Sequence, residues 1–163
     1  MAISINNELA SQISNNTVRF GAFAALDMHD PAVAAQELNR TVTELGFLGA
    51  LVNDYQQSGS GDNREAPILV LSHRKLIVHA VTFIYYDQPA FDVFWQMVVD
   101  LDVPVYFHPR VNPAPVSTLL FAHAPFLIGP AQEFAATLST HLLGLCTNGV
   151  FEYECCTRIC SQR

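Results

Sequence analysis

The sequence predicts an α/β fold with parallel strands, arranged either as a doubly wound sheet or as a (β/α) barrel. Nearly continuous apolar runs at residues 19–26, 47–52 and 103–108 have the composition of strands that are covered on both faces. Amphipathic helical patterns separate these runs, so strand and helix alternate along the chain. With 50% hydrophobic and 14% charged residues in a length of 163, the composition is that of one globular domain.

The first strand, helix and strand are predicted within residues 19–52. A helix ending over residues 9–13, closed by two turn-forming asparagines, precedes them. After the first apolar run, Asp30 supplies an N-cap and Pro31 the first helical position. Apolar residues then recur every three or four positions until Gly46, which predicts an amphipathic helix that ends there. The second apolar run follows at once, so this part of the chain predicts a βαβ unit.

The second half of the chain predicts two more helices around the third strand. The sequence Asp-Gln-Pro at 87–89 starts a helix whose apolar stripe runs to Leu101. The strand at 103–108 comes next, and a helical pattern over residues 130–145 follows, with an Asn-Gly turn behind it. Three supported strands are fewer than the roughly eight of a complete barrel, so we expect about three βα units and a sheet with two open edges.

Two segments depart from this pattern. Residues 64–82 contain two apolar runs around a basic centre, where a βα loop should be short and polar. They are interpreted either as a β-hairpin or as an insertion that was never selected to fold here. From residue 153 onward, a cysteine-rich tail shows neither helical nor strand periodicity. We therefore expect one domain over residues 1–152, interrupted by an irregular insertion at 64–82, and a foreign tail at 153–163.

Charge and cysteine content restrict location and partners. The net charge is -7 and the 8 Lys and Arg residues are spread thinly, so no basic stripe is available for nucleic acid or for an anionic membrane. The N-terminus lacks the pattern of a signal peptide, and no run reaches the roughly 18 apolar residues needed to span a bilayer. We expect a cytoplasmic protein in which the four cysteines between Cys146 and Cys160 are free thiols rather than disulfides or a metal cluster.

Polar residues at the predicted carboxyl ends of the strands are candidates for a functional site, because ligands and metals gather there in parallel α/β folds. They are Asp27, His29, Asn53, Asp54, His108 and Arg110. An imidazole directly at a strand end, such as that of His108, can coordinate a divalent metal, although an ordinary hydrogen-bonded histidine is the simpler interpretation. Arg110 can hold a substrate carboxylate with two hydrogen bonds or form a surface ion pair.

For several polar residues, a structural role is at least as good an explanation as a functional role. Asn53 and Asp54 can line a pocket, but Asn-Asp is also a common turn sequence. His29 and Asp30 precede a helix, where capping is the expected role. His141 lies in the last helical pattern and is expected to pack or to face solvent. The sequence contains no glycine-rich phosphate loop, G-x-S-x-G elbow or H-E-x-x-H pair.

Five segments of the chain resemble, in order, blocks of the amidohydrolase-related decarboxylases, and they are most similar to the fungal 2,3-dihydroxybenzoate and γ-resorcylate decarboxylase type. The blocks are residues 19–31, 44–54, 86–95, 103–110 with its sequence His108-Pro-Arg110, and 147–151. Their combination in family order is far more specific than any single block. The resemblance covers residues 19–152 apart from the segment 64–82.

The resemblance implies a partial (β/α)8 TIM barrel and a chemistry. The family binds one divalent metal ion, zinc, magnesium or manganese, and removes carbon dioxide from a small hydroxylated aromatic carboxylic acid without a redox cofactor. Its His-Pro-Arg block supplies a metal ligand, which is His108 in this chain, and we expect Asn53 and Arg110 to contact the substrate. Self-association into a homo-oligomer is one way to cover the open edges of the sheet.

The chain also departs from the family pattern. The family's opening pair of metal ligands has no counterpart before Arg19, and the later Gly-His block with the catalytic histidine is replaced after Phe151 by the tail. No catalytic residue is therefore assigned, and we expect this chain to be a truncated, inactive form. One hypothesis for the two anomalous segments is a translated intron or insertion at 64–82 and a shifted reading frame in the tail, and the alternatives are a hairpin insert and a natural truncation. Two alternatives stay open: a metal-dependent hydrolase of the same superfamily and a non-catalytic interaction protein.

Overall fold

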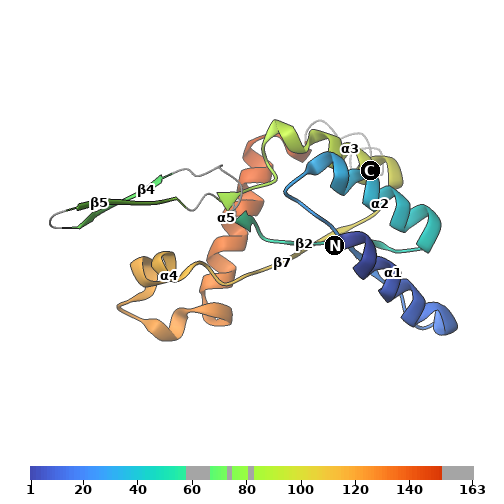
Figure 1. Ribbon diagram of the computed structural model, residues 1–163, viewed down its shortest axis with the longest axis horizontal. Coiled ribbons are helices and arrows are strands. Elements are labelled where there is room, and N and C mark those ends of the chain that lie inside the picture. Colours follow the sequence, from blue (N-terminus) through green and yellow to red (C-terminus); the bar gives the residue numbers. More distant parts are fainter. Residues whose placement is uncertain (58–66, 73–74, 81–82, 152–163) are drawn as a thin grey trace, which may run out of the picture.

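A parallel sheet of three strands in the order β1-β2-β7 forms the centre of the molecule (Figure 1). In this computed structural model, residues 1–57, 67–72, 75–80 and 83–151 are described. The strands are β1 (Phe23–Ala25), β2 (Gly49–Asn53) and β7 (Val105–His108). Both neighbouring pairs are parallel, with Ala24 opposite Ala50 and Ala50 opposite Val105. The predicted α/β fold with a parallel sheet is confirmed.

Each strand begins later than its apolar run, because the first residues of the runs belong to turns. The N–H groups of Arg19 and Phe20 both donate to the carbonyl of Asn16, at 3.0 and 3.1 Å, so these two residues still close a turn. Phe47 likewise donates its N–H to Thr41 at the end of the preceding helix, at 3.0 Å. Hydrophobicity therefore locates the strands, whereas local hydrogen bonds set where pairing begins.

Helix α2 (Pro31–Leu45) has the start and stop that its sequence predicts. The Asp30 carboxylate accepts the N–H groups of Ala32 and Val33, each at 3.1 Å, which satisfies two free donors of the first turn. At the other end Gly46 adopts a left-handed conformation with φ 70°, which residues with a Cβ rarely adopt. The apolar stripe of α2 packs on the sheet, and Leu38 is fully buried.

Helix α3 (Asp92–Leu101) lies beside α2 and covers the same face of the sheet (Figure 1). A single 3-10 turn, η2 (Pro89–Phe91), precedes it, so the predicted helix start at Pro89 is a turn of tighter geometry. The two helices and the sheet enclose one hydrophobic core. Its buried members are Ala22, Ala24, Met28, Ala34, Leu38, Phe47, Ala50, Val52, Tyr86, Phe91, Phe94, Trp95 and Leu145.

Helix α1 (Ala2–Ile13) covers the outer edge of β1. The sequence analysis predicts only the end of this helix, over residues 9–13. Its buried Asn6 donates to the carbonyl of Ala25 and accepts the N–H of Ala25, both at 2.9 Å. The side-chain amide thus replaces the peptide group of a neighbouring strand at one position of this edge. Asn6 also donates to Glu37 on α2 at 2.8 Å, which connects α1 to α2.

The segment after β7 contains a helix that the sequence analysis did not predict, α4 (Ala114–Phe121). Two 3-10 turns follow, η3 (Pro125–Leu127) and η4 (Gly129–Ala131), and the last helix α5 spans Glu133–Thr147. The helix predicted from residue 130 therefore starts three residues later, because residues 129–131 form the second 3-10 turn.

A fully buried carboxylate, that of Glu133, organises this segment. It accepts the N–H and side-chain amide of Asn112 at 3.3 and 2.9 Å, the hydroxyl of Ser117 at 2.6 Å and the N–H of Gly129 at 2.8 Å. Burial acts to raise the pKa of Glu133, but these hydrogen bonds from Ser117, Gly129 and Asn112 outweigh it and lower the pKa below the ordinary carboxyl value.

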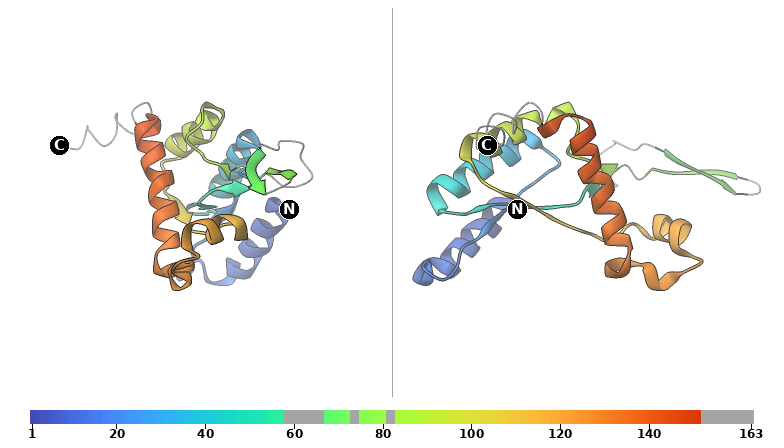
Figure 2. Two further views of the ribbon diagram at one scale, coloured as in Figure 1. Left: turned by 90° about the vertical axis from the view of Figure 1, so that its left-hand side faces the viewer. Right: turned by 180° about the vertical axis from the view of Figure 1, so that it is seen from behind.

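A β-hairpin of β4 (Pro67–Ser72) and β5 (Lys75–Ala80) extends away from the sheet and the helices (Figure 1 and Figure 2). A short antiparallel pair, β3 (Gln56–Gln57) with β6 (Phe83–Ile84), lies between it and the sheet. The hairpin interpretation of the segment 64–82 is confirmed for these strands, and the rest of the segment lies outside the described residues, as does the tail 153–163. No helix within the described ranges is long and apolar enough to cross a membrane.

The two faces of the parallel sheet differ in cover. Residues that point to the helices are buried in β1 and β2 and partly buried in β7. The alternate residues point the other way, and there Phe23, Leu51 and Tyr106 are 37%, 38% and 53% exposed. Asn53 and His108 end this second row. In a closed barrel this would be the inner face, where side chains from neighbouring strands fill the interior.

Candidate functional site

Asn53 and His108 are paired neighbours at the carboxyl ends of β2 and β7. Both side chains are on the exposed face of the sheet. The N–H of Asp54 donates to the carbonyl of His108 at 2.8 Å, which continues the pairing of the two strands one residue further. The structure thus brings together two of the three residues that the sequence analysis selected.

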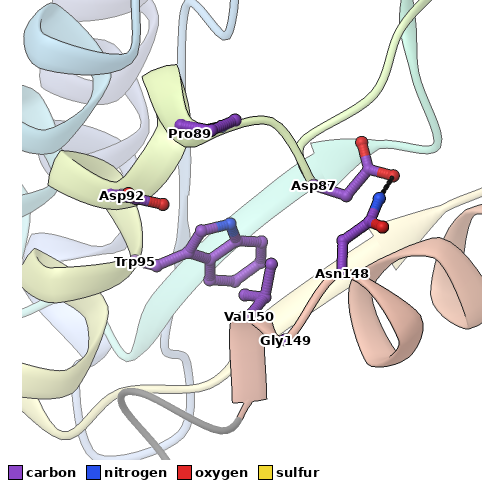
Figure 3. Close-up of a pocket in the computed structure, with 7 residues that line it drawn as sticks. All are labelled: Asp87, Pro89, Asp92, Trp95, Asn148, Gly149 and Val150. Atoms are coloured by element: carbon purple, nitrogen blue, oxygen red, sulfur yellow. Dashed lines mark hydrogen bonds between the residues drawn. The ribbon is translucent and has the colours of Figure 1, made fainter.

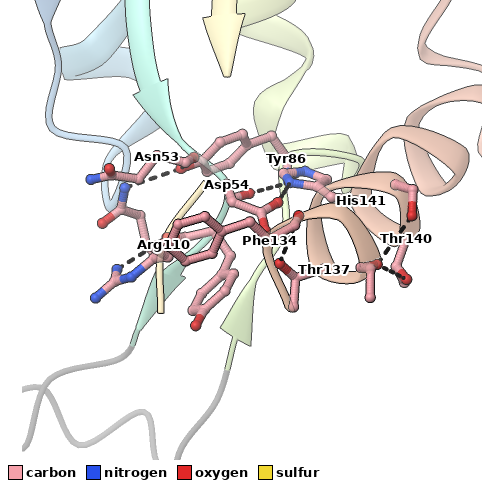
Figure 4. Close-up of polar contacts among 12 residues, drawn as sticks. Asn53, Asp54, Tyr86, Arg110, Phe134, Thr137, Thr140 and His141 are labelled. Atoms are coloured by element: carbon pink, nitrogen blue, oxygen red, sulfur yellow. Dashed lines mark hydrogen bonds and ion pairs between the residues drawn. The ribbon is translucent and has the colours of Figure 1, made fainter. Parts of the chain in front are cut away.

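Arg110, the third of these residues, lies two residues beyond the end of β7 (Figure 4). Its guanidinium is held above an aromatic ring. Its guanidinium carbon lies 5.1 Å from the ring centroid of Tyr55, and its Nη1 donates to the carbonyl of the same residue at 3.2 Å. Within the described ranges it forms no ion pair. The buried Tyr55 donates its hydroxyl to the Asn112 side chain at 3.0 Å, and burial raises its pKa to about 12. The guanidinium is therefore fixed by a ring contact and a carbonyl, neither of which neutralises its charge.

Behind these strand ends, a buried histidine that the sequence analysis did not select joins three segments. His141 on α5 is 1% exposed. Its Nε2 accepts the N–H of Tyr86 at 2.9 Å, and its Nδ1 contacts the carbonyl oxygen and, at 3.3 Å, the carboxylate of Asp54. Of the two expected roles, packing and facing solvent, the structure shows packing, but the sequence gives no sign of these partners. Its only signal is its place within the apolar stripe of the last helix.

Tyr86 fixes the end of β2 from a second direction (Figure 4). Its hydroxyl donates to the carbonyl of Asn53 at 2.8 Å and accepts from the side chain of Gln56 at 3.0 Å. Its own carbonyl accepts the indole N–H of Trp95 at 2.8 Å. Burial raises the pKa of this tyrosine far above its ordinary value, so the hydroxyl stays protonated and acts as a donor.

The remaining candidates have structural roles or lie apart. Asp30 caps α2, as expected, whereas His29 contacts the carboxylate of Asp27 through both its N–H and its ring, each at 3.2 Å. Cys146 is a free thiol, and the other cysteines lie outside the described residues.

A cavity of about 310 Å³ lies between the start of α3 and the end of α5 (Figure 3). Its lining consists of Asp87, Pro89, Asp92, Trp95, Asn148, Gly149 and Val150. Asn148 donates its side-chain amide to Asp87 at 2.9 Å, so one of the two carboxylates is already engaged. None of the three selected residues lines this cavity, and we assign no function to it.

The described residues do not form a metal site by themselves. In this part of the chain no three His, Cys, Asp or Glu side chains lie close enough together to hold an ion. A catalytic metal usually has about three protein ligands, and His108 is a single one. Any metal at this strand end would therefore need ligands in addition to those that these residues offer.

The fold and the sequence both match known decarboxylases. The chain is 40% identical over 147 residues to the γ-resorcylate decarboxylase of Rhodococcus jostii (strain RHA1), an alignment that covers 90% of this chain and 40% of the relative. The structure of 2,6-dihydroxybenzoate decarboxylase complexed with 2,6-dihydroxybenzoate superposes with a TM-score of 0.76 at 38% identity, over 94% of this chain and 41% of that one.

A second solved structure gives the same result and contains a metal. The dihydroxybenzoic acid decarboxylase from Polaromonas sp. JS666, with bound manganese and the inhibitor 2-nitroresorcinol, has a TM-score of 0.76 at 39% identity, over 94% of this chain and 40% of that one. The chain thus spans about 40% of the length of the relatives that it matches. Residues 1–146 match the amidohydrolase family, which confirms the resemblance seen in the sequence blocks. The chain belongs to the amidohydrolase family.

Proposed function

We propose that the chain is part of a metal-dependent carboxy-lyase that removes carbon dioxide, without redox chemistry, from a hydroxylated aromatic acid. The observation that carries this proposal is the 40% identity to γ-resorcylate decarboxylase, together with the likeness to a structure that holds 2,6-dihydroxybenzoate. Both the fold and the residues at the strand ends are consistent with it.

The sheet, in this proposal, supplies three neighbouring strands of a (β/α)8 barrel, and residues 1–152 are the corresponding part of the barrel domain. Three features support this. The sheet is parallel, its helices cover one face only, and the opposite face carries exposed apolar side chains. In a closed barrel, further strands cover such a face.

The reaction needs a group that holds the substrate carboxylate and a proton for the ring carbon. As the bond between ring and carboxylate breaks, the ring carbon keeps the electron pair, takes up a proton, and carbon dioxide leaves. We assign the carboxylate contact to Arg110, whose guanidinium is held in place by Tyr55. We assign a hydrogen bond to a ring hydroxyl to Asn53, the strand-end neighbour of His108. The proton donor is not assigned.

His108 would contribute one ligand to the metal. The manganese in the Polaromonas relative supports a divalent ion in this family. Because the described residues offer a single ligand here, we propose that the 163-residue chain alone does not turn substrate over.

A chimera tests the function. Residues 83–151 of this chain would replace the aligned segment of the Rhodococcus jostii γ-resorcylate decarboxylase, and release of labelled carbon dioxide from 2,6-dihydroxybenzoate would be measured with manganese. We expect decarboxylation, and a loss of about 100-fold or more on His108→Ala, since a metal ligand matters at least as much as its supporting residues. A chimera that folds and binds manganese but releases no carbon dioxide would contradict the proposal.

A further inference from the structure

His141 is placed to control the strand ends without touching a ligand. Its ring lies among the rings of Tyr85, Tyr86 and Phe107, with centroid distances of 4.9, 4.9 and 5.3 Å. Phe107 directly precedes His108, so the imidazole packs against the end of β7 as well as bonding to the end of β2. This one side chain of α5 therefore contacts Phe107 in β7 and Asp54, the residue that follows β2.

The hydrogen bonds of the ring define its tautomer. Because Nε2 accepts the N–H of Tyr86, that nitrogen carries no proton, and the ring proton is on Nδ1. Nδ1 faces the carbonyl and the carboxylate of Asp54, both of which are acceptors. The neutral Nδ1–H form of His141 thus satisfies both nitrogens.

Two short paths lead from His141 to the candidate site. In the first, the ring donates to Asp54, whose N–H donates to the carbonyl of His108 at 2.8 Å. In the second, Tyr86 is held by the ring at its N–H, and its hydroxyl donates to the carbonyl of Asn53 at 2.8 Å. The peptides of both candidate residues are therefore fixed by groups that meet at one imidazole.

Asp54 depends on this contact for its place. It is fully buried, and its Oδ2 has no hydrogen-bond partner within the described ranges. Among the described residues, His141 is the side chain that bonds to Asp54. Loss of the imidazole would leave the Asp54 carbonyl without its donor in a buried position, which favours a local rearrangement of the strand end.

We propose that His141 is a positioning residue, which acts through Asp54 and Tyr86 to set the places of the His108 imidazole and the Asn53 amide. The assignment of those two groups to metal and substrate rests on the proposed function. The physical coupling between them and α5 does not.

The test uses the full 163-residue chain labelled with ¹⁵N, with the histidine rings and backbone amides followed by NMR. We expect wild-type His141 to be the Nδ1–H tautomer. His141→Phe, which keeps a ring but removes both hydrogen bonds, should shift the His108 ring signals and speed hydrogen exchange of the Asp54 amide about tenfold. His141→Asn, which retains a donor toward Asp54, should restore most of that protection.

Asn6→Ala is the control, because it removes buried hydrogen bonds at the opposite edge of the sheet and should leave the His108 signals in place. Equal shifts in the control and in His141→Phe, or an Nε2–H tautomer in the wild type, would overturn the proposal. The tautomer is read in the wild type and so decides the matter even if His141→Phe does not fold. The metal role of His108 is tested separately, in the chimera and its His108→Ala variant, so failure of that role would leave the positioning result standing.

Discussion

The βαβ unit over residues 23–53 and the segment over residues 110–133 are stabilised in different ways. The first has an apolar core, and its helix begins and ends at capping residues next to it in the sequence. The second has little buried apolar surface of its own and is held by the four hydrogen bonds that converge on Glu133. Residues that carry the candidate site belong to both regions, so the stability of each matters for function.

Glu133→Ala should have the largest effect, and the effect should be local. Removing the carboxylate leaves the buried donors of Asn112, Ser117 and Gly129 without an acceptor, at a cost of about 4 kcal/mol to the order of that segment. Hydrogen exchange should show lost protection over residues 110–133, while the amides of β1 and β2 stay protected.

Glu37→Ala is the matched control, since Glu37 is the corresponding buried carboxylate of the βαβ unit. Its partners Asn6 and Arg40 can still form hydrogen bonds without it, because Asn6 also bonds Ala25 and Arg40 reaches solvent. We expect a loss of about 1 kcal/mol. Equal losses for the two variants would show that the two regions are not stabilised differently.

Leu38→Ala should have the next largest effect, and the effect should be global. Leu38 is fully buried between α2 and the sheet, and such truncations cost about 3 kcal/mol through lost contacts and the cavity left behind. Chemical denaturation followed by circular dichroism should show the whole sheet unfolding at lower denaturant. Lost protection confined to α2 would mean that the core does not unfold as one unit.

These contrasts also explain what the sequence could predict. Helix α2 is set by Asp30 and Gly46, which act on neighbouring backbone, so its ends were predicted to the residue. Helix α4 has no one-sided apolar stripe, and its place depends on Glu133, which bonds residues up to 21 positions away. Periodicity contains no trace of such a contact.

The candidate site shows the same contrast between positions that the sequence predicts and contacts that it does not. Asn53 and His108 were predicted to lie together, because parallel strands bring their carboxyl ends to one edge of a sheet. His141 was not connected with them, since 87 positions separate it from Asp54 and 55 from Tyr86. A buried histidine of this kind becomes visible only when three segments are in place.

Lowering the pH should change the stability of the segment over residues 110–133 through Glu133, and this is the smallest of the expected effects. The folded pKa of Glu133 lies below the ordinary value of 4.5, so as the pH falls the unfolded chain takes up the proton first. The stabilisation by this carboxylate is therefore fully present at neutral pH, declines as the pH falls below about 4.5, and is lost as the pH passes through the folded pKa.

Hydrogen exchange of residues 110–133 measured between pH 6 and pH 3 (roughly the range that brackets this titration) would follow the decline, after correction for the intrinsic exchange rate. Glu133→Gln keeps the shape but cannot titrate, so its segment should start less stable and show no such decline. Glu37→Gln removes the buried carboxylate of α2 and should leave the decline over residues 110–133 unchanged. If wild type and Glu133→Gln lost protection over the same pH range, the order of this segment would not depend on the Glu133 charge.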